Sequence, residues 1–257
     1  MSADLIPIKV WIAGASGFCG RALTLELAQD ERFVVSPHLR PSSRRLERLC
    51  EEWEQLGLRP VIAEWAELEA PFQALQPDVV VSLIGTTKRQ AKRGGGGYRE
   101  VDEGLNLQLI ELSRGLRSPA QLIYLSSQGA EWGRWSAYLG ARMRVEAALH
   151  SSGLSGAILR PGLLSGESRD EARPLEELGA RVSHKLVRLC ELLKLHRLAL
   201  SFKPLDAPEL ALLIKRTLLE LRELKVNQGL IKTYELTELH ERLLEARIGA
   251  DLLPSSS

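Results

Sequence analysis

Up to about residue 160, short runs of β-branched and apolar residues alternate with longer stretches whose apolar residues recur at helical spacing. The short runs predict strands and the longer stretches predict helices. Strands are expected at 8–13, 33–39, 60–63, 78–84, 121–126 and 156–160, and helices at 18–29, 42–56, 66–75, 98–116 and 135–151. Alternation of this kind is typical of a parallel sheet connected by crossover helices. The pattern therefore predicts an α/β fold with a doubly wound parallel sheet.

Composition and charge exclude several classes of protein. The chain has 257 residues, of which 44% are hydrophobic and 26% charged, and its net charge of +1 gives no basis for a nucleic-acid partner. No apolar run approaches membrane-spanning length, and the first strand begins too close to Met1 for a cleavable signal segment. We therefore expect a cytoplasmic protein without a membrane partner. The cysteines Cys19, Cys50 and Cys190 lack metal-like spacing, so no metal site is expected.

The segment KVWIAGASGFCG (9–20) places three glycines between the first expected strand and the first expected helix. Such a turn exposes backbone N–H groups and the positive end of the helix dipole to an anion. Glycine spacing permits the tight turn, the approach of phosphate and close packing of helix on strand. A tight turn that binds nothing is the alternative, but the strand–helix–strand context favours the pyrophosphate of a dinucleotide. The candidate cofactor-binding residues here are Gly14, Ala15, Ser16, Gly17, Phe18, Cys19 and Gly20.

The end of the second expected strand indicates which dinucleotide binds. A site that prefers NAD(H) places a carboxylate there for the ribose hydroxyls, whereas SPHLRPSSRR (36–45) has no acidic residue. It supplies Arg40 and Arg44, with Arg45 next to them, and guanidinium groups bind phosphate through two parallel hydrogen bonds. We therefore expect NADP(H), with NAD(H) as the less favoured alternative. In the opposing interpretation, Arg44, Arg45 and Arg48 form a solvated helix face.

The glycine spacing and several later segments resemble the short-chain dehydrogenase/reductase superfamily, particularly its extended and atypical members. In chain order these segments are DVVVSLIGTT (78–87), YREVDEGLNLQLIELS (98–113), LIYLSSQGAEW (122–132), YLGAR (138–142), ILRPGLLSG (158–166) and FKPLDAPELALLI (202–214). LIGTTKRQA, LSSQGA and LRPGLLSG look most like the atypical group that contains the Tat-interacting-protein oxidoreductase of animals and its bacterial relatives. The resemblance covers roughly residues 8–215 and implies an NAD(P)-binding Rossmann fold.

The resemblance also implies where the two halves of the cofactor lie. Gly85 and Thr86, at the end of the fourth expected strand, border the adenosine half. Pro161 and Gly162 form the proline-glycine segment beside the nicotinamide.

In the same family, a tyrosine and a lysine four residues later carry the acid–base chemistry. Here these positions hold Tyr138 and Arg142, which share a helix face because they are one turn apart. A free tyrosine titrates near pH 10, so acid–base work near neutrality needs a fixed positive charge beside it. Arginine supplies that charge but does not exchange its proton. The candidate catalytic residues are Tyr138, Ser127, Ser126 and Arg142. The structural alternatives are a tyrosine packed at a helix–sheet seam and serines in a strand-end turn.

Two functions from different classes follow. The first is an NADP-dependent oxidoreductase of the atypical short-chain dehydrogenase type, which moves hydride between the nicotinamide and a small carbonyl or alcohol substrate. The second is a catalytically weak or inactive dinucleotide-binding regulatory or assembly protein. Arg142 favours the second function, whereas retention of Tyr138 and the serine pair favours the first. The basic, glycine-rich loop at 88–97 is interpreted as a solvated loop rather than a lid.

The last third of the chain is leucine-rich and highly charged. One helical stripe there consists of Leu178, Val182, Leu186, Leu189 and Leu193. Residues 198–221 predict a strand, a turn and a helix, and residues 229–248 predict a last strand and helix. We expect a single Rossmann-type domain over 1–257, with a dinucleotide-binding core over 8–165 and a small, mostly helical C-terminal substrate lobe over 166–257.

Overall fold

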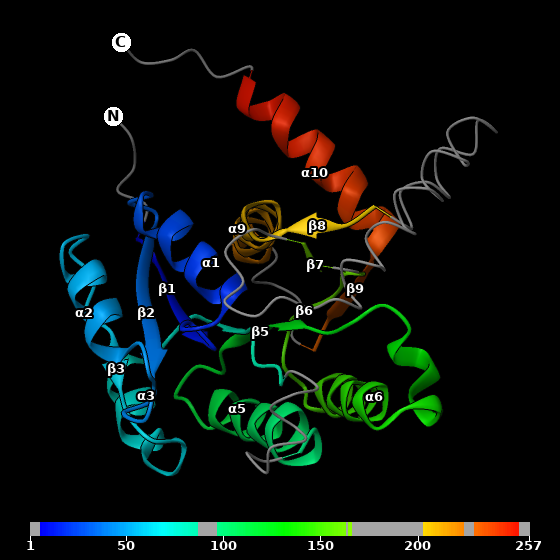
Figure 1. Cartoon of the computed structure of the whole chain (residues 1–257), viewed down its shortest axis with the longest axis horizontal. Coiled ribbons are helices and arrows are strands. Elements are labelled where there is room, and N and C mark those ends of the chain that lie inside the picture. Colours follow the sequence, from blue (N-terminus) through cyan, green and yellow to red (C-terminus); the bar gives the residue numbers. More distant parts are fainter. Residues whose placement is uncertain (1–5, 87–96, 163, 166–202, 224–228, 252–257) are drawn as a thin grey trace.

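The main sheet is parallel and has its strands in the order β3-β2-β1-β4-β5-β6-β9 (Figure 1). The computed structural model describes residues 6–86, 97–162, 164–165, 203–223 and 229–251. The strands are β1 (Ile8–Ala13), β2 (Phe33–Leu39), β3 (Val61–Ile62), β4 (Val79–Ser82), β5 (Gln121–Leu125), β6 (Gly156–Arg160) and β9 (Ile231–Glu235). A separate parallel pair is formed by β7 (Leu164–Ser165) and β8 (Leu205–Asp206). Because the strand order reverses between β1 and β4, the predicted doubly wound α/β fold is confirmed.

Helices cover both faces of the sheet (Figure 1). The α-helices are α1 (Phe18–Ala28), α2 (Leu46–Glu54), α3 (Glu69–Leu75), α5 (Leu105–Arg114), α6 (Ala137–Ser151), α9 (Ala207–Glu223) and α10 (Leu236–Asp251). Three shorter helices are η1 (Trp65–Glu67), η2 (Arg99–Gly104) and η3 (Ala130–Trp135), of which η2 is a π-helix. Helices α1 and α9 lie on one face of the sheet, and α3, α5 and α6 lie on the other (Figure 1).

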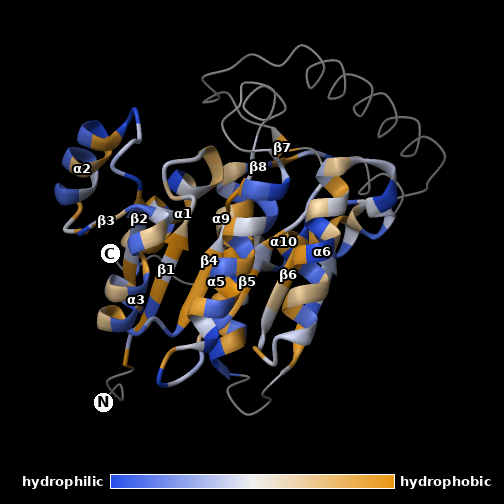
Figure 2. Ribbon diagram, turned by 90° about the horizontal axis from the view of Figure 1, so that it is seen from below, coloured by the Kyte–Doolittle hydropathy of each residue, from blue (hydrophilic) through white to orange (hydrophobic). Residues whose placement is uncertain are grey.

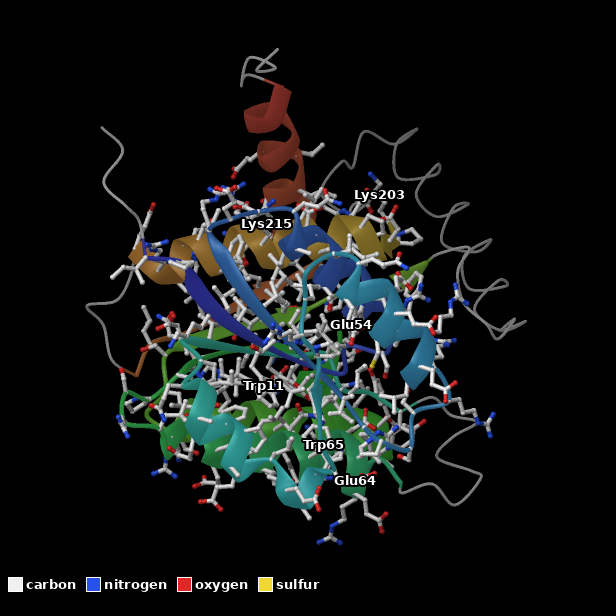
Figure 3. The ribbon with its side chains drawn as sticks, turned by 90° about the vertical axis from the view of Figure 1, so that its left-hand side faces the viewer. Trp11, Glu54, Glu64, Trp65, Lys203 and Lys215 are labelled. Atoms are coloured by element: carbon white, nitrogen blue, oxygen red, sulfur yellow. The ribbon has the colours of Figure 1, made fainter. Side chains whose placement is uncertain are left out.

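Each face of the sheet has its own hydrophobic core. Neighbouring residues of β1 point to opposite faces, so Ile12 joins the core under α1 and α9 while Trp11 joins the core under α3, α5 and α6. Figure 3 shows Trp11 on the side of the sheet that carries α3. Burial on both faces explains why the strands are nearly continuous apolar runs, which are visible in Figure 2.

The expected elements are present, with differences at their ends that have local causes. The helix expected at 42–56 begins only at Leu46, because the Ser43 amide donates to the Arg40 carbonyl in a turn at 3.0 Å. The helix expected from 135 begins after Ser136, whose hydroxyl accepts a hydrogen bond from the Leu139 amide at 3.1 Å. The stretch expected at 98–116 starts as the π-helix η2 and continues as α5.

The C-terminal part of the chain contributes directly to the sheet. Strand β9 pairs with β6 in parallel from Gly156–Ile231 to Arg160–Glu235, and α9 packs against α1. The strand and helix expected at 229–248 are therefore confirmed as β9 and α10, and the helix expected within 198–221 is confirmed as α9. The start of that segment, up to residue 202, lies outside the described residues, and the short β8 directly precedes α9. The leucine stripe at 178–193 lies outside the described residues. Among the described residues, no helix is both long enough and apolar enough to span a bilayer.

Candidate functional site

The glycine turn between β1 and α1 has the geometry that a dinucleotide pyrophosphate requires. Gly14 has a φ of +82°, and the Gly17 amide donates to the Gly14 carbonyl at 3.0 Å. A Cβ atom on Gly20 would lie 2.2 Å from the Gly14 carbonyl oxygen, so only glycine allows α1 to pack this closely on the turn. The first turn of α1 contains no acidic residue that would compete with an anion. These residues therefore fit a bound pyrophosphate.

The arginines after β2 lie next to that turn. Nη1 of Arg45 donates to the backbone carbonyl of Ser16 at 3.3 Å, while Arg40 and Arg44 are exposed. Arg45 is therefore only partly exposed and contacts the glycine turn, whereas Arg44 and Arg48 are exposed, as the solvated-face interpretation expects. The contact joins two segments 29 residues apart, so the helical pattern of α2 alone did not show it.

Helix α6 holds Tyr138 and Arg142 together, as their spacing predicts. The guanidinium carbon of Arg142 lies 5.2 Å from the centroid of the Tyr138 ring. The ring of Tyr98, just before η2, packs edge-on against the Tyr138 ring at a centroid distance of 5.4 Å. The tyrosine is therefore fixed between a cation and a second aromatic ring.

The guanidinium of Arg142 bridges the ends of two strands. Its Nη1 atom donates to the carbonyl oxygens of Leu125 at 2.8 Å and Ile84 at 3.2 Å, and to the Tyr124 hydroxyl at 3.1 Å. The side chain is buried, and its Nε atom has no hydrogen-bond partner among the described residues. Burial alone would lower the pKa of Arg142, but Tyr124, Tyr138 and Asp102 raise it, so the group stays cationic.

Asp102 is a member of this site that the sequence analysis missed. It is buried in η2, and its Oδ1 atom lies 3.0 Å from Nη2 of Arg142. Both carboxylate oxygens also accept from the Thr86 amide, at 3.2 and 3.1 Å. Burial raises the pKa of the Asp102 carboxyl, whereas Arg142 and Thr86 lower it. A signal was present in the sequence, since Asp102 and Asn106 lie on the apolar stripe that continues along α5.

Gly85 and Thr86 lie at the Arg142–Asp102 pair. A Cβ atom on Gly85 would lie 2.7 Å from Nη2 of Arg142, so the glycine makes room for the guanidinium. Gly85 itself is exposed at the edge where the strands end. The pair is therefore separated from that edge by a residue without a side chain.

The two candidate serines differ in their surroundings. The Ser126 hydroxyl is buried and has no hydrogen-bond partner among the described residues, whereas the Ser127 hydroxyl donates to the Gln128 carbonyl at 3.3 Å. The Gln128 amide in turn donates to the Pro161 carbonyl at 2.8 Å. A Cβ atom on Gly162 would lie 2.9 Å from Oε1 of Gln128, so the serine turn and the proline-glycine segment are in contact.

The candidate residues are thus grouped along one edge of the sheet, where the parallel strands β1, β4, β5 and β6 end. Parallel strands deliver their carboxyl ends to the same edge, which is where ligands bind in open α/β sheets. The glycine turn and Arg45 form one group, and Tyr138, Arg142 and Asp102 form another. Among the described residues, no cluster of His, Cys, Asp and Glu side chains is arranged to hold a metal ion. Residues 87–96 of the basic loop lie outside the described part.

Comparisons with known proteins agree with this geometry. A family model described as the NAD dependent epimerase/dehydratase family matches residues 10–194. The mitochondrial protein fmp52 of Aspergillus niger is 36% identical over 103 residues, which cover 39% of this chain and 42% of that protein. The mitochondrial protein fmp52-1 of Aspergillus terreus is 35% identical over 117 residues, covering 44% and 48%. The chain thus matches less than half of the length of these relatives.

Solved structures share the fold at low sequence identity. A short-chain dehydrogenase/reductase from Serratia marcescens has a TM-score of 0.63 at 13% identity, covering 92% of this chain and 100% of that one. A putative dehydrogenase from Burkholderia cenocepacia with bound NADP has a TM-score of 0.61 at 16% identity, covering 89% and 92%. The WbmH enzyme of Bordetella bronchiseptica in complex with NAD⁺ has a TM-score of 0.61 at 16% identity, covering 97% and 83%.

The relatives correct one expectation. From the lack of a recognisable signal segment near Met1, we expect a cytoplasmic protein. That prediction is wrong, because the curated relatives are named mitochondrial proteins. A search for a cleavable secretory segment does not test for this destination.

Proposed function

The chain belongs to the NAD dependent epimerase/dehydratase family, and on that premise we propose that it is an NADP-dependent oxidoreductase acting on a small carbonyl or alcohol. It has the Rossmann fold of the short-chain dehydrogenases/reductases. A nicotinamide dinucleotide is the cofactor of this class, and the glycine turn fits its pyrophosphate. The preference for NADP(H), the substrate class and the role of each site residue are the parts that we propose.

The observation that carries the cofactor proposal is the contact of Arg45 with the glycine turn. Its Nη1 atom lies 3.3 Å from the Ser16 carbonyl oxygen in that turn, and the segment 36–45 that ends β2 contains no acidic residue to bind ribose hydroxyls. Arg40 and Arg44 are exposed nearby and supply further positive charge. A 2′-phosphate placed there would meet guanidinium groups rather than a carboxylate.

We assign the proton chemistry to the side chains at the ends of β5 and α6. A nicotinamide dinucleotide supplies or accepts the hydride when it is bound. Tyr138 donates or accepts the proton at the substrate oxygen, with Arg142 fixed against its ring at 5.2 Å. The Ser126 hydroxyl, buried and unpartnered among the described residues, donates a hydrogen bond to the same oxygen. Ser127 is the less favoured serine because its hydroxyl already donates to Gln128.

The nucleotide preference is tested by comparing dissociation constants for NADPH and NADH. We expect NADPH to bind at least about tenfold more tightly, since each charged hydrogen bond to the 2′-phosphate contributes roughly 1.5–3 kcal/mol. Arg45→Gln and Arg40→Asp should each reduce the difference between the dissociation constants for NADPH and NADH. Arg48→Gln is the matched control, because Arg48 is exposed on α2. Equal affinities of the unmodified chain for the two nucleotides would contradict the preference.

The chemistry is tested with a panel of small aldehydes and ketones. NADPH oxidation should depend on a carbonyl compound, and Tyr138→Phe should reduce kcat by at least about 100-fold, the usual contribution of a positioned acid. NADPH binding should be retained in the variant. If the unmodified chain binds NADPH tightly and the full panel gives no turnover, the oxidoreductase proposal fails.

A dinucleotide-binding regulatory or assembly protein is the second candidate. It is favoured by the contacts of Arg142, whose Nη atoms are used by two strand-end carbonyls, Tyr124 and Asp102. If the protein has this second function, it binds nucleotide, and neither Tyr138→Phe nor Arg142→Lys changes the rate of carbonyl reduction. The first candidate gains if Arg142→Lys creates or raises carbonyl reduction and adding Tyr138→Phe removes it.

A further inference from the structure

The Arg142–Asp102 pair places two opposite charges beneath the exposed Gly85. Their side chains have 6% and 0% of their surface exposed, and Nη2 and Oδ1 are 3.0 Å apart. The Thr86 amide donates to both carboxylate oxygens, and this contact and the adjacent guanidinium favour the ionised form of Asp102. Together the two groups carry no net charge.

The position of the pair is important because an unpaired charge there would act electrostatically on groups bound at the edge of the sheet. Gly85 follows β4, and Arg142 contacts both the last carbonyl of β5 and the Tyr138 ring, so the pair lies under the carboxyl ends of these strands. The proposed function places the nicotinamide half of the nucleotide beside Tyr138. Buried charges are screened only weakly by salt. An uncompensated guanidinium would therefore act on any charged group bound at this edge.

The nicotinamide ring is such a group, since it carries a positive charge when oxidised and none when reduced. We propose that Asp102 compensates Arg142 so that the site accepts the oxidised and the reduced nucleotide with similar affinity. This inference rests on the proposed NADP(H) function. It gives a role in nucleotide binding to Asp102, which is not part of the Tyr138–Arg142 motif. Both nucleotides carry the same phosphate charges, so without Asp102 the cation of Arg142 would disfavour NADP⁺ relative to NADPH through the charged nicotinamide ring alone.

The test is calorimetric titration of the full chain and its variants with NADP⁺ and with NADPH. Asp102→Asn keeps the shape of the side chain and removes its charge. Two unit charges about 10 Å apart in a partly buried site interact strongly enough to change an equilibrium constant about tenfold. We therefore expect the ratio of the dissociation constant of NADP⁺ to that of NADPH to rise about tenfold in Asp102→Asn.

Two controls separate charge compensation from a purely structural role. Glu103→Gln removes a charge one residue away, where Glu103 pairs with the half-exposed Arg144 at 2.7 Å, and it should leave the ratio unchanged. The double variant Asp102→Asn with Arg142→Gln removes both charges and should return the ratio to that of the unmodified chain. A structural role would weaken both nucleotides equally and leave the ratio constant.

The outcomes are distinguishable. An unchanged ratio in a folded Asp102→Asn variant that binds both nucleotides overturns this inference and leaves the proposed function intact. If the unmodified chain binds neither nucleotide, the proposed function fails first and this inference fails with it. If Asp102→Asn does not fold, Asp102→Ser makes the same change of charge and leaves space for water beside the guanidinium, and its ratio decides.

Discussion

Arg142 occupies the position at which the resemblance to the short-chain dehydrogenases/reductases leads us to expect a lysine. Its planar guanidinium donates to two strand-end carbonyls and to the Tyr124 hydroxyl while it pairs with Asp102. A lysine ammonium is a single point charge that cannot reach partners in four directions. The Ile84 carbonyl follows β4 and the Leu125 carbonyl is the last of β5, so the arginine supplies a donor to acceptors at the ends of both strands.

Arg142→Lys should therefore destabilise the protein. We expect a loss of about 1–3 kcal/mol in the free energy of unfolding, the cost of leaving buried carbonyls without donors. Urea denaturation followed by circular dichroism measures it. Arg144→Lys, two residues along α6 in a half-exposed pair, should change stability by less than about 0.5 kcal/mol. Equal effects of the two substitutions would show that Arg142 is not a structural clamp.

His38 provides a second residue-scale prediction, through pH. It is buried between Trp11, which stacks on it at 5.7 Å, and Trp65, at 5.0 Å; both are labelled in Figure 3. Burial lowers the pKa of His38 from its ordinary 6.5, and the hydrogen bond to the Ala63 carbonyl only partly opposes this. The unfolded chain therefore binds more protons in this range, so stability is complete above pH 6.5 and falls as the pH drops towards the lowered pKa.

The measurement is the free energy of unfolding at pH 7.5 and at pH 5.5. We expect His38→Phe, which keeps an aromatic ring in the stack, to show a smaller loss on acidification than the unmodified chain. Part of the loss should remain, because burial also lowers the pKa of His240. His150→Phe, at an exposed position of α6, should leave the pH dependence unchanged. An unchanged loss in His38→Phe would exclude His38 as its source.

At the scale of elements, the turn from β1 into α1 was predictable because its requirements are local. Gly14 needs a positive φ, and Gly20 needs the absence of a Cβ, within a few residues of each other. Helix starts were predicted less well. Their positions depend on single contacts, such as the Ser43–Arg40 turn before α2 and the Ser136 cap of α6.

Gly20→Ala tests the close packing of α1 on the turn. Helix propensity alone would favour alanine by about 1 kcal/mol. The new Cβ, however, would lie 2.2 Å from the Gly14 carbonyl oxygen, so we expect a net loss of several kcal/mol and loss of nucleotide binding. Gly115→Ala is the control, since the nearest atom to its Cβ would be 3.5 Å away. Thermal unfolding and NADPH titration distinguish them, and a stable Gly20→Ala that binds NADPH would contradict the packing argument.

At the scale of the whole molecule, contacts between distant segments were the part that the sequence did not reveal. The Arg142–Asp102 contact joins residues 40 apart, and it requires the π-helix η2 to be packed against α6. Arg45 reaches Ser16 across 29 residues. Periodicity predicts which face of an element is buried, but it does not predict which polar groups on two such faces will meet. The strands and the glycine turn, by contrast, follow from patterns within a single segment.

Arg160, the last residue of β6, connects the core of the sheet to the C-terminal strand β9 through Glu235. It binds Glu146 of α6 through two hydrogen bonds of 3.0 and 2.6 Å, Glu235 of β9 at 2.6 Å and Glu131 of η3 at 3.3 Å. One guanidinium thus joins four elements. The bond to buried Glu146 is the main cause of the raised pKa of Arg160.

Arg160→Met should lower the free energy of unfolding by about 2 kcal/mol, because buried Glu146 loses its counter-charge while the other two acids are partly solvated. Arg114→Met, which breaks an exposed pair with Glu111, should cost less than about 0.5 kcal/mol. Urea denaturation of the two variants provides the comparison. Similar small losses would mean that the four elements are held together without Arg160.

The central claim is that the turn between β1 and α1 binds the pyrophosphate of a nicotinamide dinucleotide. Isothermal titration of the purified full chain with NADPH tests it most directly. We expect saturable binding with one nucleotide per chain. A folded chain that gives no binding signal with NADPH, NADP⁺, NADH or NAD⁺ would contradict it.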